Sequence, residues 1–299
     1  MRIEAELLID CCNDLGETPV WCARTQTLFW IDVPAPGRIF YWDKQRGSAD
    51  FYQLEDLVTG LARGARGELM VVSSRDVFEF DRATAHRRHI YSMPSDQPDH
   101  RFNDGGCDRA GRLWVGSMPN NFLEKVRAAP AQSSGRVYRV SGDGSGRSFE
   151  AHFGCPNAMC WSPDDTTFYA ADSMDGWIYA YDFDLAAGLI DNRREFCRLD
   201  DLGIPDGAAV DQDGYIWNAR WGAGAVARIS PTGELDRVVR VPATNVTACC
   251  FGGSRMDTLY ITTARHGLTA AQLAEERFAG GVFAVHTDVP GIEKNAFAF

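Results

Sequence analysis

The sequence predicts an all-β protein with the architecture of a six-bladed β-propeller, in which each blade is a four-stranded antiparallel sheet. Two types of strand follow one another in an unchanging order through six copies, turn signals separate the strands, and no long amphipathic helix interrupts them. The copies lie about 40 to 55 residues apart, close to the period of a propeller blade. A β-sandwich or a barrel does not account for a sixfold period, whereas radial repetition does, and it also protects the sheet edges.

The expected elements follow in order along the chain. The first strand type occupies 28–32, 68–72, 112–116, 167–171, 215–219 and 258–262, and the second occupies 38–42, 76–80, 136–140, 177–181, 225–229 and 281–285. These segments are β-branched and aromatic, and many alternate apolar with polar residues, as strands do. Turn signals lie at 109–111, 162–165, 211–214 and 230–233.

Three further segments complete the expected architecture. We expect a longer loop at 120–132 in the third copy and a helix-like insertion at 268–278 in the sixth. The sixth copy runs out near the C-terminus, so we expect the N-terminal strand 3–9 to complete the last blade. Residues 1–299 are therefore predicted to form one domain.

The composition argues against several classes of function. The 299 residues are 45% apolar and 24% charged, which is typical of a globular protein. A net charge of −11 repels phosphate backbones and anionic lipids, so we expect neither nucleic-acid nor membrane partners. The sequence contains no run of about 18 apolar residues, so we expect no membrane-spanning helix. The nine cysteines include no CxxC pair, and we interpret them as reduced, mostly buried thiols of a cytoplasmic protein, which we expect to be a monomer.

Three oxygen-bearing side chains lie in one register just before apolar strands. The runs 16–21, 156–161 and 205–210 place Glu17, Asn157 and Asp206 at matching positions. Each run begins the innermost strand of its blade, so these side chains should ring one mouth of the central channel. Any one of them alone would be an ordinary turn-former. Three in register favour a site for one divalent cation, because such oxygens suit Ca²⁺, Mg²⁺ or Mn²⁺, while Zn²⁺ or Fe²⁺ can also occupy them.

The remaining copies offer other residues at this place. The third copy supplies Asp104, with Asn103 before it, and the sixth supplies Asn245. The second copy has Thr59 followed by Gly60 and offers no charge. The six histidines form no HxH or HExxH pattern and no GxSxG elbow is present, so neither a histidine-based metal site nor a serine esterase is expected.

Four groups of residues resemble a known family. They are GETPVW (16–21), RFNDG (101–105) leading to DRAGRLWVGSM (108–118), Asn157 with WSPD (161–164) and YAADS (169–173), and PDG (205–207) with DGYIW (213–217). Together they resemble the senescence-marker-protein/gluconolactonase/regucalcin family of six-bladed propellers, over about residues 6–285. The resemblance implies that Glu17, Asn157 and Asp206 bind a single divalent metal. It also implies that Arg101 and Asn103 contact a sugar lactone.

One position departs from the family pattern. After the Gly-Ser/Thr-Met motif, regucalcin-like members carry an acidic residue that touches the substrate, whereas this chain continues with Pro119, Asn120 and Asn121. Asn121 can still bind a substrate hydroxyl by a hydrogen bond, but it brings no charge. The departure puts the identity of the sugar in question rather than the reaction.

Lactone hydrolysis also fits these residues on physical grounds. Opening an ester ring needs an electrophile on the carbonyl oxygen, which a divalent metal supplies, and an activated water. Asp206 is the candidate general base, Arg101 would anchor a ring hydroxyl or carbonyl, and Asn103 would orient the substrate or a water. We therefore predict a metal-dependent carboxylic-ester hydrolase of sugar catabolism, acting on an aldonolactone such as a glucono-, xylono- or arabinonolactone.

Three alternatives stay open. Arg101 would instead form a surface ion pair if it met an acidic neighbour such as Asp99. The same site would serve an organophosphate or another ester. A non-catalytic propeller that binds calcium or a partner protein would use the cation without any hydrolysis.

Overall fold

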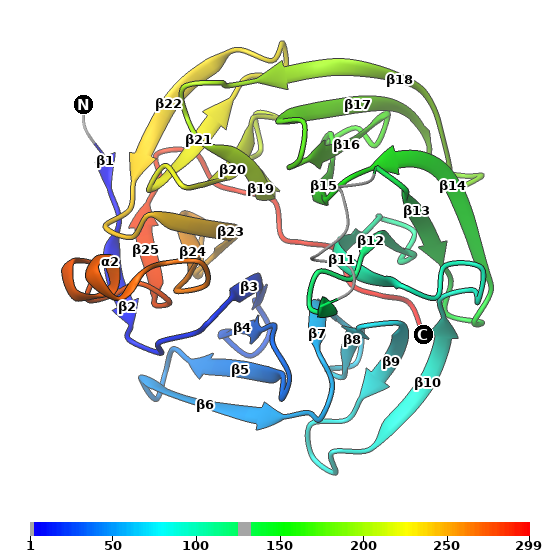
Figure 1. Ribbon diagram of the computed structural model, residues 1–299, viewed down its shortest axis with the longest axis horizontal. Helices are drawn as coiled ribbons and strands as arrows, with labels where there is room; N and C mark the ends of the chain where they lie inside the picture. Colours follow the sequence, from blue (N-terminus) through cyan, green and yellow to red (C-terminus); the bar gives the residue numbers. More distant parts are fainter. Residues whose placement is uncertain (1–2, 125–132) are drawn as a thin grey trace.

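Six sheets stand around a common axis in a computed structural model that describes residues 3–124 and 133–299 (Figure 1). The chain passes from blade to blade in sequence order, and the predicted six-bladed all-β architecture is confirmed. Within the described residues, no helix is long and apolar enough to cross a membrane.

Each blade contains four antiparallel strands, of which the first lies innermost (Figure 1). Blade 1 consists of β3 (Gly16–Cys22), β4 (Thr27–Asp32), β5 (Arg38–Asp43) and β6 (Ser48–Gln53), and blade 2 of β7 (Val58–Arg63), β8 (Leu69–Ser73), β9 (Asp76–Phe80) and β10 (Arg87–Ser92). Blade 3 consists of β11 (His100–Cys107), β12 (Leu113–Pro119), β13 (Gly135–Val140) and β14 (Gly146–Phe153), and blade 4 of β15 (Pro156–Trp161), β16 (Thr167–Asp172), β17 (Trp177–Asp184) and β18 (Leu189–Arg198). Blade 5 contains β19 (Ile204–Val210), β20 (Ile216–Trp221), β21 (Ala225–Ile229) and β22 (Leu235–Arg240), and blade 6 contains β23 (Asn245–Gly252), β24 (Thr258–Ala264), β25 (Val282–His286) and β2 (Glu6–Ile9).

The N-terminal segment closes the ring, as predicted, but it serves two blades. β2 pairs antiparallel with β25 and becomes the outer strand of blade 6. Just before it, the short strand β1 (Ile3–Glu4) pairs in parallel with β22 of blade 5. The break between them falls at Ala5, whose N–H donates to the carbonyl of Arg240 at 2.8 Å. The predicted single strand 3–9 therefore bridges two adjacent blades.

Large side chains fill the space between neighbouring blades. The rings of Trp217 from β20 and Phe251 from β23 meet edge to face, with centroids 5.6 Å apart, and both are almost fully buried. The indole N–H of Trp217 donates to Asp211 at 2.9 Å, so its one polar atom stays satisfied. Burying a side chain as large as Phe251 stabilises the fold by about 1.5–3 kcal/mol. This packing explains the aromatic residues that recur in the second strands.

The two expected insertions lie where the sequence predicts them. The helix α2 (Ala270–Glu275) lies between β24 and β25 of blade 6 and begins after the N-cap residue Thr269. The longer loop of blade 3 follows β12, and its residues 125–132 lie outside the described part of the chain.

The C-terminal segment, residues 290–299, runs across one end of the channel and is drawn in red in Figure 1. Backbone hydrogen bonds tie it to four blades: Gly291 to Met256 at 2.8 Å, Ile292 to Val210 at 2.9 Å, Phe297 to Arg63 at 2.7 Å and Ala298 to Gly111 at 2.9 Å. Phe297 is fully buried among the side chains of blades 2 and 3. The sequence showed no repeat in this segment, and its path was not predicted.

Candidate functional site

Strand pairing defines one equivalent position in every blade. In each blade, one residue of the second strand pairs with the inner-strand residue that directly precedes this position. The six pairs are Asp32 with Gly16, Ser73 with Val58, Ser117 with Phe102, Asp172 with Pro156, Arg220 with Pro205, and Thr263 with Val246. The next residues, here called the ring residues, are Glu17, Thr59, Asn103, Asn157, Asp206 and Thr247. Regular pairing is interrupted at or directly after each of them. Such β-bulges redirect side chains, which here brings residues of neighbouring blades together.

Two sequence assignments change with this register. In blade 3 the ring residue is Asn103, and Asp104 lies one position further along the strand. In blade 6 the ring residue is Thr247, whereas Asn245 lies two positions earlier and donates to the carbonyl of His266 at 3.0 Å. The prediction that Asp104 and Asn245 share the register of Glu17 is therefore wrong. Bulges add residues to the inner strand, so spacing along the sequence alone does not fix the register.

The carboxylates of Glu17, Asp206 and Asp104 lie close enough to influence one another. Burial raises the pKa of Glu17 to about 8, and the negative charge of Asp104 adds to the rise. Burial, followed by the charges of Glu17 and Asp104, raises the pKa of Asp206 well above its usual range. Asp206 is only 7% exposed. A cation bound here would therefore favour the ionised carboxylates, which the surrounding protein solvates poorly.

A chain of hydrogen bonds joins blade 3 to blade 5. Asn103 donates from Nδ2 to Asn157 Oδ1 at 3.1 Å. Asn157 donates from its own Nδ2 to Ser173 Oγ at 2.8 Å, and Ser173 Oγ donates to the carbonyl of Pro205 at 2.6 Å. Pro205 directly precedes Asp206, so this chain links two of the three predicted metal ligands.

The predicted substrate-binding residues also lie together. Arg101 donates from Nη1 to Asn103 Oδ1 at 2.7 Å. It donates to Asn121 Oδ1 twice, from Nε at 3.1 Å and from Nη2 at 3.0 Å. Arg101 is 4% exposed, which contradicts the alternative of a surface ion pair with Asp99. Asn121 is exposed above it, so the two side chains form one edge of the site.

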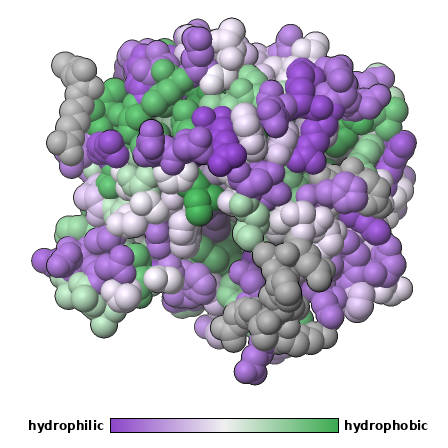
Figure 2. Space-filling view, turned by 45° about the horizontal axis from the view of Figure 1, so that its top comes forward, coloured by the Kyte–Doolittle hydropathy of each residue, from purple (hydrophilic) through white to green (hydrophobic). Residues whose placement is uncertain are grey.

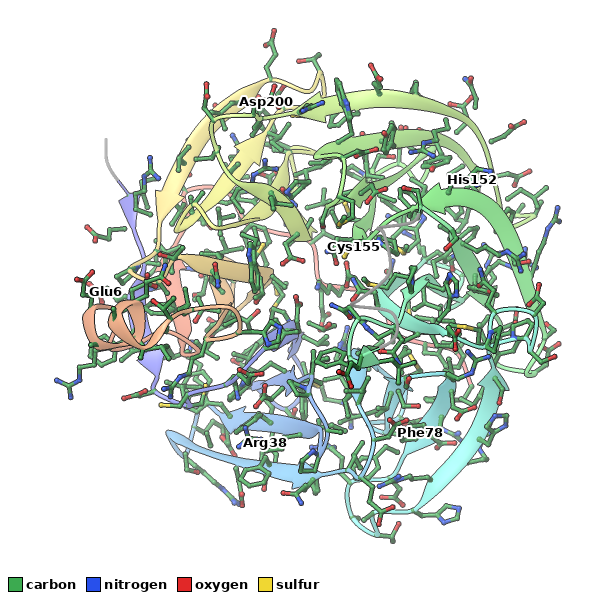
Figure 3. All side chains as sticks on the ribbon, viewed as in Figure 1. Glu6, Arg38, Phe78, His152, Cys155 and Asp200 are labelled. Carbon is green, nitrogen blue, oxygen red and sulfur yellow. The ribbon has the colours of Figure 1, made fainter. Side chains whose placement is uncertain are left out.

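Cys155 lies near the centre of the molecule in Figure 3, whereas His152 and Asp200 lie at its periphery. The sulfur of Cys155 is 3.9 Å from Asn103 Nδ2 and 3.8 Å from Asn157 Nδ2. Burial raises the pKa of Cys155 to about 12, so the group is a neutral thiol at physiological pH. The molecular surface is hollowed close to the middle of the face seen in Figure 2.

Beyond the ring residues the channel continues as a cavity of about 80 Å³. Its walls come from the inner strands of blades 3 to 6, which contribute Asp104, and from the C-terminal segment, which contributes Lys294. Burial raises the pKa of Asp104, and the positive charge of Lys294 opposes the rise. Of the predicted site residues none lines this cavity, so it is a second compartment next to the site rather than the site itself.

The donor set fits a divalent cation of the oxygen-preferring class. Glu17 Oε2 accepts one hydrogen bond, from the N–H of Thr18 at 2.9 Å, and the carboxylate keeps further lone pairs for a ligand. In the described residues no three His, Cys, Asp or Glu side chains gather closely enough to hold a metal ion. A cation here would therefore need an amide oxygen, that of Asn157, beside the carboxylates of Glu17 and Asp206.

Sequence reasoning missed two residues of this region. Ser173 belongs to the YAADS motif, but its role depends on a contact with Pro205 in the next blade, which no local pattern reveals. Lys294 follows the last repeat, where there is no periodicity from which to place it.

Comparison with known proteins gives consistent results along the sequence. A family model described as the SMP-30/Gluconolactonase/LRE-like region matches residues 15–265. A regucalcin of Danio rerio is 33% identical over 291 residues, which cover 95% of this chain and 94% of that protein. The family resemblance of the four motif groups is confirmed.

Solved structures agree with the sequence matches. A calcium-binding protein, regucalcin, from Agrobacterium tumefaciens strain C58 superposes with a TM-score of 0.92 at 26% identity, covering 100% of this chain and 99% of that chain. A luciferin-regenerating enzyme superposes with a TM-score of 0.87 at 25% identity, covering 96% of both chains. The chain therefore belongs to the SMP-30/gluconolactonase/LRE-like family, and its structure is a lactonase-like six-bladed propeller.

Proposed function

We propose that the protein hydrolyses a sugar lactone to the sugar acid with the help of one divalent metal ion. The observation that carries the proposal is the meeting of two groups of side chains. The charge of Glu17 helps to raise the pKa of Asp206, and Asn157 is joined through Ser173 to the carbonyl of Pro205, the residue before Asp206. Arg101 adjoins this group through its hydrogen bond to Asn103.

Each residue has a stated task. Glu17, Asn157 and Asp206 would hold the cation, which when bound supplies an electrophile for the lactone carbonyl oxygen. Asp206 would accept the proton of the attacking water at a carboxylate oxygen. Arg101 and Asn103 would hold the sugar ring by hydrogen bonds, so that the ester is bound in one orientation relative to the attacking water.

The nine free cysteines favour a reducing compartment such as the cytoplasm. We propose that the protein acts there as a monomer on a small-molecule aldonolactone such as a glucono-, xylono- or arabinonolactone, with Ca²⁺, Mg²⁺, Mn²⁺, Zn²⁺ or Fe²⁺ as the metal.

The test compares Asp206→Asn with Asp200→Asn, a matched change at a side chain that is 71% exposed at the periphery (Figure 3). Both proteins are treated with chelator, reloaded with each divalent metal in turn and assayed on a panel of pentono- and hexonolactones. We expect kcat of Asp206→Asn to fall about 10²- to 10⁴-fold, the usual contribution of a general base. Asp200→Asn should keep wild-type rates. Wild-type turnover by Asp206→Asn would contradict the proposal.

Calcium binding without hydrolysis is the second candidate, because the similar Agrobacterium tumefaciens protein is a calcium-binding regucalcin. The same panel separates the two. A protein that binds Ca²⁺ tightly but hydrolyses neither lactones nor phosphotriesters would favour the second candidate, and preferential turnover of phosphotriesters would indicate an organophosphate hydrolase.

A further inference from the structure

Arg101 is a buried cation whose hydrogen-bond acceptors are neutral oxygens. Among the described residues, no Asp or Glu carboxylate forms an ion pair with its guanidinium within 4.0 Å. The oxygens that it meets are neutral: those of the Asn121 and Asn103 side chains and the carbonyl of Phe102, which accepts from Nη1 at 2.8 Å. The ring of Phe122 lies 5.4 Å from the guanidinium carbon and covers one face.

This arrangement leaves a positive charge at the edge of the site. Burial lowers the pKa of Arg101 to about 10, which is still far above neutral pH, so the group stays charged. Taking a charge out of water without pairing it is costly, and proteins seldom leave such a charge uncompensated. Among the described residues, the carboxylate that acts on the charge of Arg101 is that of Glu17, which the proposed function assigns to a metal ion.

The hydrogen-bonding groups of this edge are donors only. A guanidinium has five N–H groups, and four of those of Arg101 are directed at protein oxygens, which leaves one on Nη2. Asn121 Oδ1 is occupied by two of these donors, so the amide offers a ligand its Nδ2 group, at an exposed position. A ligand group that approaches Arg101 and Asn121 therefore meets N–H donors beside a positive charge.

We propose that the physiological substrate is an anionic lactone, one that carries a carboxylate or phosphate group outside its ring, and that Arg101 and Asn121 bind this group. This inference rests on the proposed lactonase function and makes it more specific. Hydrogen bonds from a charged donor to an anion are shorter and about twice as strong as those between neutral groups. The lactone of a sugar diacid fits this description, and so does the lactone of a phosphorylated sugar acid.

The first experiment measures kcat/KM of the metal-loaded protein on three 1,4-lactones with the same ring and configuration. These are the lactones of gluconic acid, which is neutral, of glucaric acid, which carries a carboxylate, and of 6-phosphogluconic acid, which carries a phosphate. We expect kcat/KM for at least one anionic lactone to exceed that for the neutral lactone by about tenfold or more, the difference between a charged and a neutral hydrogen bond.

The second experiment gives Arg101 an acidic partner. In Asn121→Asp the new carboxylate should pair with the guanidinium and repel the anionic group, so the ratio of anionic to neutral kcat/KM should fall about tenfold or more. The matched control is Gln45→Glu, which makes the same amide-to-acid change at an exposed turn between β5 and β6. This control should keep the wild-type ratio. Thermal unfolding of each variant confirms that it is folded.

The outcomes are distinct. A preference for either anionic lactone that Asn121→Asp removes supports the inference, and the favoured compound tells carboxylate from phosphate. Hydrolysis of the neutral lactone with equal or greater kcat/KM, unaffected by Asn121→Asp, would overturn the inference while the lactonase function stands. Failure to hydrolyse any of the three with any divalent metal would overturn both.

Discussion

Replacing Ser173 by alanine should weaken metal binding although Ser173 itself is no predicted ligand. Its hydroxyl accepts a hydrogen bond from Asn157 Nδ2 at 2.8 Å and donates one to the carbonyl of Pro205 at 2.6 Å. Ser173→Ala removes both bonds at once. The amide of Asn157 then loses the contact that holds its Nδ2 group and keeps only the bond that its Oδ1 accepts from Asn103, and the backbone beside Asp206 loses its link to blade 4.

The expected size of the effect follows from these two bonds. Leaving a buried donor or acceptor unsatisfied costs about 1–3 kcal/mol. Residues that hold metal ligands in place by hydrogen bonds typically change metal affinity by about 10- to 100-fold when mutated, which corresponds to about 1.4–2.8 kcal/mol. The two ranges agree, so we expect the Kd of the metal to rise about 10- to 100-fold in Ser173→Ala.

Calorimetric titration of chelator-treated protein with each divalent metal measures this Kd. Ser173→Thr keeps the hydroxyl and should bind metal nearly as the wild type does. Ser162→Ala is the matched control, because Ser162 Oγ also makes two hydrogen bonds in blade 4, to Asp164 at 2.6 Å and from the N–H of Thr167 at 3.0 Å, but in a turn at the other end of the blade. A Kd for Ser173→Ala within twofold of that for Ser162→Ala would refute the reasoning.

Four further predictions concern pH and stability. Because the pKa of Glu17 is raised to about 8 in the metal-free protein, protons compete with the cation for this carboxylate. Metal affinity should therefore rise with pH up to about 8 and level off above it. A Kd that does not change with pH in titrations from pH 6 to 9 would contradict this. The same shift should make the metal-free protein less stable as pH rises from about 4.5 to 8, since the protonated form is favoured in the folded state, and urea unfolding at several pH values measures this. Asp211→Ala should destabilise the fold by about 3–5 kcal/mol, because the indole of Trp217 loses its acceptor and the almost fully buried Arg228 loses one of the two carboxylates to which it donates, the other being that of Asp236. A loss below about 1 kcal/mol in urea unfolding would be incompatible with that account. Phe297→Ala should cost about 3–5 kcal/mol by the same measurement, since its side chain is fully buried, and a wild-type midpoint would show that the C-terminal segment does not stabilise the fold.

The architecture was predictable from sequence because every blade has the same pattern of burial. Every second strand is buried on both faces between neighbouring blades, so it carries a run of aromatic and β-branched residues that is visible without a structure. The closing role of strand 3–9 could be predicted as well, because blade 6 lacked an outer strand. Its division at Ala5 between two blades could not, since nothing in the local pattern distinguishes one pairing partner from another.

The candidate site was only partly predictable for a related reason. Glu17, Asn157 and Asp206 could be grouped because their motifs align directly. Asp104 was placed one position wrongly, because the bulge in β11 shifts the pairing between Phe102 and Gly105 and a bulge leaves no signature in the spacing of apolar residues. Contacts across blades depend on the relative positions of separate sheets, which a linear pattern does not contain.

The C-terminal segment limits how far two blades on different sides of the ring can separate. Between Gly291, bonded to blade 6, and Ala298, bonded to the turn after β11 in blade 3, the chain has a fixed reach, because an extended residue spans at most about 3.6 Å. The two attachment points can therefore lie at most about 25 Å apart. Any opening of the ring that moved them beyond this distance would have to break one of these hydrogen bonds.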